Sequence, residues 1–164
     1  MKTVLLVCHA NTARSIIAHA LLERMLAERE AAHRIRIRSG GIANYARDGM
    51  LPSLDARLVL REDGIDLDED ALTSTDLRRH RHLVAEADLI LTMTAAQKRS
   101  IGLFPEAQGR PVFTLREFAG EDGDIDDPAT QGEHVFRACR DDIKRCLVRG
   151  LDRLLQALAE PAAR

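Results

Sequence analysis

Four short, strand-like runs alternate along the chain with longer segments of helical periodicity, and this alternation constrains the fold more than any other feature. The runs "TVLLVC", "HRIRIRSGG", "ADLILTM" and "PVFTL" predict strands at residues 3–8, 33–41, 87–93 and 111–115. Strands separated by helices pair in parallel, because the chain must cross back over the sheet between them. We therefore expect an α/β fold in which helices cover both faces of a parallel sheet.

The helical segments are bounded by their apolar spacing and by end signals such as proline and glycine. Helices are expected from Arg14 to about Glu30, from Pro52 to Gly64, from about Ala95, and from Gln131 to Ala159. A further short helix, capped by Ser74 or Thr75, is expected before the third strand, and residues 161–164 are expected to fray. The first strand is apolar throughout and so central, whereas the second alternates arginine with isoleucine and so lies at an edge.

Length and charge exclude several classes of protein. The chain has 164 residues, 45% of them hydrophobic, and a net charge of −2, which favours one domain spanning residues 1–164. Nucleic-acid and membrane-surface proteins are usually strongly basic, and no apolar run approaches the roughly 18 residues of a membrane span. Three cysteines do not make a disulfide framework, so we expect a reducing compartment, the cytoplasm.

The stretch "VCHANTARSII" contains candidate catalytic residues at the junction between the first strand and the first helix. Cys8 ends the strand, Arg14 begins the helix, and five residues lie between them. Backbone N–H groups of such a loop can converge on an anion, and an arginine can hold two of its oxygens. This positive environment favours the thiolate form of a cysteine, and Ser15 can donate a hydrogen bond to it. The loop is therefore equipped for phosphoryl transfer through a cysteinyl phosphate.

Such chemistry also needs a general acid for the leaving group, and the segment "DIDDP" before the last helix offers three candidates. These are Asp124, Asp126 and Asp127, of which the last precedes Pro128 and is therefore held in an extended conformation. On composition alone, an acidic turn that caps the last helix explains the segment equally well.

Taken together and in order, these motifs resemble the low-molecular-weight protein phosphatases, and most closely the bacterial protein-arginine phosphatases. The shared features are V-C-x-x-N-x-x-R-S, S-x-G after the second strand, "GIDL", "ADLILTMT" and the late Asp-Pro. The resemblance implies a single-domain, four-stranded parallel sheet in the order 2-1-3-4, with no metal and no cofactor. It also implies site residues: Cys8 as nucleophile, Arg14 as phosphate clamp, Asp127 as general acid, Ser15 as support for the thiolate, Asn11 and Ser39 as supports of the loop, and His9, Ala10, Thr12 and Ala13 as the rest of the phosphate loop.

Several positions depart from the family pattern and bear on substrate choice. Ala10 stands where glycine is common, so a positive φ there would be strained. No aromatic residue follows Asp127-Pro128 to stack on phosphotyrosine, although Tyr45 is a possible replacement at the substrate rim. Thr12 stands where tyrosine-directed members usually carry isoleucine or leucine and phosphoarginine-directed members carry threonine. Phosphotyrosine, phosphoarginine or both are therefore expected as substrates in proteins.

Other classes fit the sequence less well. Arsenate reductases of this fold need two further cysteines, but residues 65–100 contain none. A non-catalytic phosphoprotein-binding module would need neither the nucleophile nor the acid, and a dinucleotide-binding protein would carry G-x-G-x-x-G. The expected partner is a phosphorylated protein substrate, with no nucleic acid and no membrane, and the expected assembly is a monomer or weak dimer.

Overall fold

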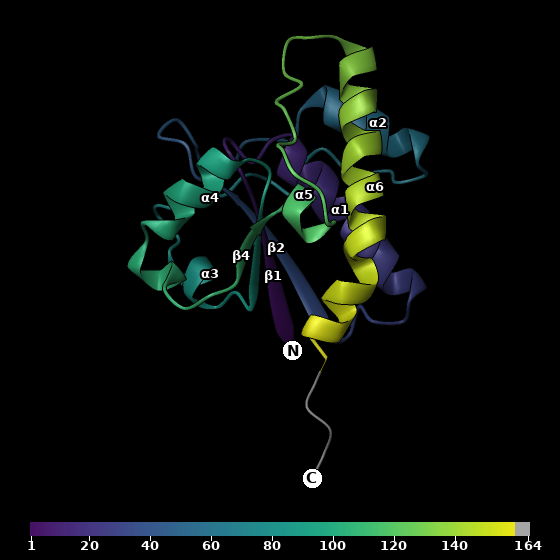
Figure 1. Ribbon diagram of the computed structural model, residues 1–164. Coiled ribbons are helices and arrows are strands. Elements are labelled where there is room, and N and C mark those ends of the chain that lie inside the picture. The colour runs from purple at the N-terminus through teal and green to yellow at the C-terminus, as the bar shows by residue number, and fades with distance from the viewer. Residues whose placement is uncertain (160–164) are drawn as a thin grey trace.

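A four-stranded parallel sheet forms the centre of the molecule, as the computed structural model shows for residues 1–159 (Figure 1). The strand order is β2-β1-β3-β4, and the strands are β1 (Lys2–Cys8), β2 (Ile35–Gly41), β3 (Leu89–Thr92) and β4 (Val112–Thr114). The expected fold class and strand order are thereby confirmed. The expected frayed tail at residues 161–164 lies outside the described residues.

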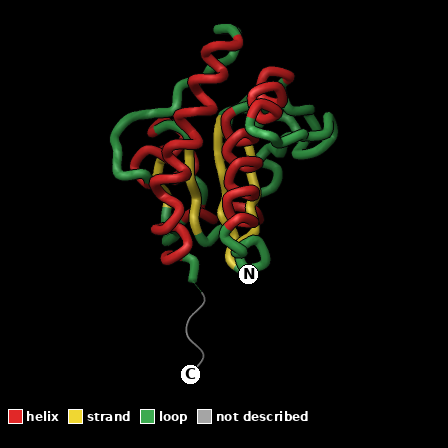
Figure 2. Tube along the Cα trace, turned by 90° about the vertical axis from the view of Figure 1, so that its right-hand side faces the viewer, coloured by secondary structure: helices red, strands yellow, loops and turns green. Residues whose placement is uncertain are grey.

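Two layers of helices cover the sheet. On one side lie α1 (Arg14–Glu28), α2 (Leu54–Glu62), α5 (Leu115–Phe118) and the long α6 (Glu133–Ala157); on the other lie α3 (His82–Ala85), α4 (Ala95–Gly102) and the 3₁₀ turn η1 (Pro105–Ala107). In Figure 2 the layer of α1 and α6 faces the viewer, with the strands behind it. No helix among residues 1–159 is both long and apolar enough to span a bilayer.

The alternation of side chains along β1 divides the core into two parts. Val4, Leu6 and Cys8 belong to the large cluster with α1 and α6, whereas Leu5 and Val7 belong to the smaller cluster with α3 and α4. All five are almost fully buried. A strand that is apolar on both faces is what a central strand between two helical layers requires.

The register of the sheet brings the ends of three strands to one edge. Cys8 pairs with Gly41 of β2, and Val7 pairs with Thr92 of β3. The loops that follow these strands therefore leave the sheet side by side, where ligands bind in open parallel sheets.

Three expected helix starts were wrong. Helix α2 begins at Leu54 rather than Pro52, because the side chain of Ser53 accepts the N–H of Ala56 as a cap. Ser74 caps no helix; its hydroxyl accepts the N–H of Met50 at 2.9 Å and ties two loops together.

The short helix before β3 is α3, and its N-cap, Arg81, makes no side-chain capping bond. The last helix begins at Glu133 instead of Gln131, since Gly132 has φ of 99°. The sequence analysis did not predict η1 or α5, each of which is a single turn of three or four residues.

Candidate active site

The loop between β1 and α1 wraps around the sulfur of Cys8. The N–H of Asn11 points at the sulfur from 3.2 Å, and the hydroxyl of Ser15 lies 3.0 Å from it. Ser15 also accepts a hydrogen bond from Asn11 Nδ2 at 2.6 Å, which leaves the serine proton free for the sulfur. Both contacts stabilise a thiolate, because a thiolate can only accept hydrogen bonds.

Asn11 is the turning point of the loop. Its φ of 61° is left-handed, a conformation that asparagine adopts more readily than most residues. Its side-chain oxygen accepts the N–H of Thr75 at 2.9 Å, so both ends of the amide are used. Ala10, by contrast, has no positive φ, so the absence of glycine there causes no backbone strain.

The end of β2 supports the loop from behind. The N–H groups of Ile42 and Ala43 donate to the carbonyls of Cys8 and His9, each at 3.0 Å. A Cβ on Gly41 would lie 2.6 Å from the carbonyl oxygen of His9, which is far inside contact distance. Only glycine at position 41 lets β2 approach the phosphate loop this closely.

Arg14 connects the phosphate loop to the acidic loop before α6. It is only 3% exposed. Its Nη1 donates to the carbonyl of Ile125 at 2.7 Å, and its Nη2 lies 4.0 Å from Oδ2 of Asp127. The carbonyl contact occupies one end of the guanidinium group and orients the remaining donors.

The three aspartates of "DIDDP" have different surroundings. Asp124 Oδ1 accepts the N–H of Ala95, the first residue of α4, at 2.8 Å and so joins this loop to the helix, whose N-cap is Thr94. Asp126 lies in a separate depression that also contains Cys139. Asp127 alone among the three lines the pocket that contains Cys8.

That pocket has a volume of about 220 Å³ and opens over the phosphate loop. It holds most of the residues predicted from the sequence, and its lining is Cys8, His9, Ala10, Thr12, Ala13, Arg14, Tyr45, Ser53, Asp127, Ala129 and Phe136. Asn11 and Ser15 are buried behind it.

The side chain of Ser39, predicted as a support of the phosphate loop, forms its hydrogen bond with helix α1. Its hydroxyl lies 2.9 Å from Nδ1 of His19, whose Nε2 lies 2.7 Å from Glu23. These contacts tie β2 to α1, on which His19 and Glu23 lie.

Five residues at the site were missed by the sequence analysis: Ser53, Thr75, Ile125, Ala129 and Phe136. Ser53 lines the pocket, and its N–H donates to the carbonyl of Thr12 at 2.9 Å. Phe136 forms part of the wall from α6, and Ile125 supplies the carbonyl for Arg14. Thr75 and Ile125 act through backbone groups, which leave no signal in residue type.

Burial and charge shift the titration of two groups near the pocket. Burial and the positive charge of Arg14 lower the pKa of His9, against an opposing contribution from Asp127. Burial raises the pKa of Cys139 to about 12, so this thiol stays protonated. Among residues 1–159, no group of three or more His, Cys, Asp or Glu side chains is placed to hold a metal ion.

A thiol at the floor of an anion-binding loop, on the carboxyl edge of a parallel sheet, defines a cysteine-dependent phosphatase. The sequence profile described as low molecular weight phosphotyrosine protein phosphatase matches residues 3–162, and the chain belongs to this family. It is therefore a low-molecular-weight protein phosphatase, a hydrolase.

The similar proteins include enzymes with two different substrate descriptions. A protein-arginine-phosphatase of Geobacillus stearothermophilus is 36% identical over 157 residues, which cover 94% of this chain and 95% of that protein. A solved structure described as YwlE arginine phosphatase from the same organism has a TM-score of 0.82 at 34% identity and covers 100% of this chain and 99% of that chain. A probable low molecular weight protein-tyrosine-phosphatase, EpsP of Ralstonia solanacearum, is 36% identical over 155 residues, 93% of this chain and 92% of that protein.

One further solved structure bears on the mechanism of the family. It is a YwlE arginine phosphatase in which serine replaces the active-site cysteine and is phosphorylated. It is 31% identical to this chain, covers 94% of this chain and 95% of its own, and has a TM-score of 0.79.

Proposed function

We propose that this protein dephosphorylates phosphorylated proteins in two steps, with Cys8, Arg14 and Asp127 as its catalytic residues. In the first step the Cys8 thiolate attacks phosphorus and an S–P bond forms. The bond from phosphorus to the substrate oxygen or nitrogen breaks, and Asp127 gives its proton to the leaving atom. Arg14 and the loop N–H groups hold the phosphoryl oxygens throughout.

In the second step water hydrolyses the cysteinyl phosphate. The Asp127 carboxylate takes a proton from the attacking water, the S–P bond breaks, and inorganic phosphate leaves. Ser15 and the N–H of Asn11 stabilise the thiolate that is released, since both lie within hydrogen-bond distance of the sulfur. The observation that carries this mechanism is that a thiol and a buried arginine of the β1–α1 loop and an aspartate from a distant segment line one pocket.

Exchange of the nucleophile tests this mechanism. Cys8→Ser is expected to abolish turnover but to retain phosphate binding in calorimetry, because Arg14 and the loop N–H groups remain. Full activity of the variant would remove Cys8 from the mechanism, and loss of phosphate binding together with turnover would show that the loop had collapsed.

We propose phosphoarginine as the preferred substrate. Thr12 lines the pocket, where isoleucine or leucine would crowd a guanidinium group and pack against a phenyl ring. The residues after Asp127-Pro128 are Ala129, Thr130 and Gln131, so this side of the pocket lacks an aromatic stacking surface. The similarity to proteins described as arginine phosphatases supports the same preference.

Phosphotyrosine is the second candidate, and one residue favours it. Tyr45 lines the pocket and is 56% exposed, so its ring is available to a flat substrate. The similarity to the tyrosine phosphatase of Ralstonia supports this alternative.

Hydrolysis of matched phosphoarginine and phosphotyrosine peptides distinguishes the two substrates. Wild type is expected to give the higher kcat/KM on phosphoarginine, and Thr12→Ile to shift the ratio toward phosphotyrosine by about 1–3 kcal/mol, the range for one altered pocket group. Tyr45→Ala serves as the companion variant, because it should lower activity on phosphotyrosine only. Good hydrolysis of phosphotyrosine and none of phosphoarginine by wild type would reject the preference.

The setting of the reaction is also a proposal. A catalytic thiolate works best where thiols stay reduced, which supports the cytoplasm as its compartment. We propose that the chain acts as one domain, as a monomer or weak dimer, on phosphorylated proteins and without a metal. Activity that is lost to EDTA and restored by a divalent ion would overturn the metal-free mechanism.

A further inference from the structure

The loop that carries Asp127 is attached to the rest of the protein at few points. Its middle is fixed by the N–H of Ile125, which donates to the carbonyl of Met93 at 2.8 Å, and by the side chain of Asp124, which accepts the N–H of Ala95 of α4 at 2.8 Å. Apart from the 4.0 Å approach of Arg14 Nη2 to its Oδ2, the described contacts of Asp127 are local, such as the one from the Ala129 N–H to its Oδ1 at 3.0 Å. The position of its carboxyl group therefore depends on how firmly the preceding residues are held.

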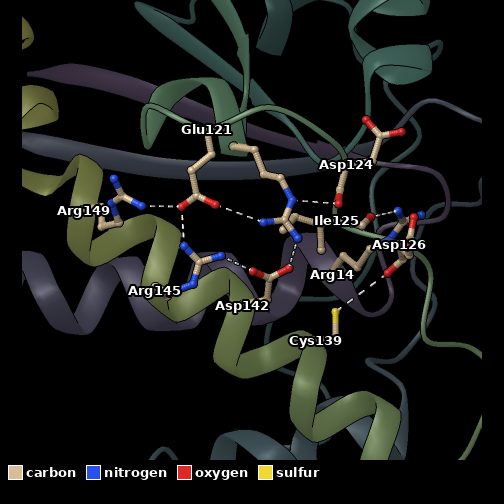
Figure 3. Close-up of polar contacts among 10 residues, drawn as sticks. Arg14, Glu121, Asp124, Ile125, Asp126, Cys139, Asp142, Arg145 and Arg149 are labelled. Carbon is tan, nitrogen blue, oxygen red and sulfur yellow. Dashed lines mark hydrogen bonds and ion pairs between the residues drawn. The ribbon is translucent and has the colours of Figure 1, made fainter.

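Two arginines hold successive carbonyl groups of this loop from different sides. Arg14 of the phosphate loop donates to the carbonyl of Ile125 at 2.7 Å. Arg116 of α5 donates through Nε to the carbonyl of Asp124 at 2.9 Å. Figure 3 shows Asp124, Glu121 and Asp142, the residues to which Arg116 bonds, together with Arg14 and Ile125. The two peptide units that flank Ile125 are thus each held at their carbonyl oxygen by a guanidinium group.

Arg116 is in turn held by two carboxylates. Its Nη1 lies 3.3 Å from Glu121, and its Nη2 forms an ion pair with Asp142 of α6. Arg145 binds both of these carboxylates and lowers the pKa of Glu121 through its hydrogen bond. The side chains of Arg116, Glu121 and Asp142 are only 20–24% exposed, so solvent screens this network less than most surface pairs.

We propose that Arg116 is a positioning residue for the general acid: anchored to α6 through Asp142 and Glu121, it fixes the Asp124 carbonyl and thereby aims Asp127 at the leaving group. Arg116 contacts neither the pocket nor Cys8 and acts only through the loop. The inference rests on the proposed role of Asp127 as general acid.

The test uses a series of aryl phosphates with leaving groups of different basicity. Leaving groups of low pKa depart with little protonation, whereas the basic phenolate of phenyl phosphate must be protonated by the general acid as it departs. Arg116→Gln is expected to lower kcat/KM about tenfold or more on phenyl phosphate and far less on 2,4-dinitrophenyl phosphate, a part of the about 10²–10⁴-fold that general acid catalysis supplies. A variant whose folded fraction was merely reduced would lose the same factor of activity on every substrate.

Asp127→Asn is the reference variant, and it should show the full dependence on leaving group. Adding Arg116→Gln to it should cause little further loss, because the group that Arg116 positions is already gone. Arg149→Gln is the matched control. Arg149 pairs with Glu121 at 2.8 Å but is not among the residues that hold the loop carrying Asp127, so this variant should have wild-type activity on every leaving group.

Equal losses on all leaving groups, or additive losses in the double variant, would overturn the proposal. If Arg116→Gln fails to fold, Asp142→Asn replaces it with the same expected selectivity and the same contradicting results. A wild type that is inactive, or an Asp127→Asn that shows no leaving-group dependence, would instead reject the proposed function itself.

Discussion

At the scale of single residues, a side chain in the site can be required both for the backbone conformation that it allows and for the hydrogen bonds that it forms. Asn11 is the clearest case, because it combines a φ of 61° with an amide that bonds Ser15 and the N–H of Thr75. Aspartate or serine would keep part of this pattern, but neither offers a donor and an acceptor on one planar group. The sequence motif shows that an asparagine is present, and the structure shows why.

His9 gives a prediction about pH. Burial and the charge of Arg14 lower its pKa in the ligand-free pocket, because both disfavour the imidazolium form. Phosphate bound in the pocket would bring negative charge close to the ring and partly offset Arg14. The pKa of His9 is therefore expected to rise when phosphate binds.

NMR titration of the His9 imidazole, with phosphate and with chloride at equal ionic strength, measures this shift. Since the pKa in the free protein is lowered, the charged form should appear at a higher pH with phosphate than with chloride. An unchanged or lower pKa would place phosphate away from His9.

At the scale of secondary structure elements, the close approach of β2 to the phosphate loop can be tested at Gly41. Gly41→Ala would place a methyl group 2.6 Å from the His9 carbonyl oxygen, so the loop or the strand must move. We expect a loss of about 1–3 kcal/mol in the free energy of unfolding, typical of overpacking, together with weaker phosphate binding. Urea unfolding and calorimetry measure the two effects.

Gly102 in α4 provides the matched control for this substitution. An added Cβ there meets nothing within 4 Å, and its φ is not positive. Gly102→Ala should therefore leave phosphate binding unchanged and alter stability by no more than about 0.5 kcal/mol. Equal effects of the two variants would show that the contact at Gly41 has no special role.

The elements also show what sequence patterns can and cannot predict. The apolar run in β1 predicted a buried central strand, because burial on both faces leaves a continuous signal. The caps around 52–54 and 74–82 were misplaced, because Ser53 and Ser74 are equally good caps in sequence and only tertiary contacts separate them.

The same distinction, between features with a signal in residue type and features set by tertiary contacts, applies to the residues of the site. Cys8, Arg14 and Asp127 were predicted because their residue types carry chemistry. The carbonyl of Ile125 and the N–H of Thr75 were not, because every residue offers these groups.

At the scale of the whole molecule, the fold makes one thiol accessible to reagents from the solvent and buries the other two. Cys8 opens into the pocket, whereas Cys139 and Cys146 face the core from α6. Burial raises the pKa of Cys139 to about 12 and also raises the pKa of Cys146. Only a thiolate attacks an alkylating reagent, so these two thiols should react slowly.

Iodoacetamide at pH 8 is accordingly expected to modify Cys8 first, with loss of activity and with protection by phosphate. Mass spectrometry of peptides after partial reaction identifies the labelled cysteine. Faster labelling of Cys139 than of Cys8 would contradict the described burial of α6.

The attachment of the phosphate loop through its main chain has a consequence for engineering. The carbonyls of His9, Thr12 and Ala13 accept N–H groups from the segment after β2, the N-cap of α2 and α1, so these three residues hold the loop without using their side chains. Ala10 likewise needs no special backbone conformation. Positions 9, 10, 12 and 13 therefore form a set in which a combinatorial library can diversify the pocket wall, while Asn11 and Ser15 are kept constant to preserve their contacts with the Cys8 sulfur.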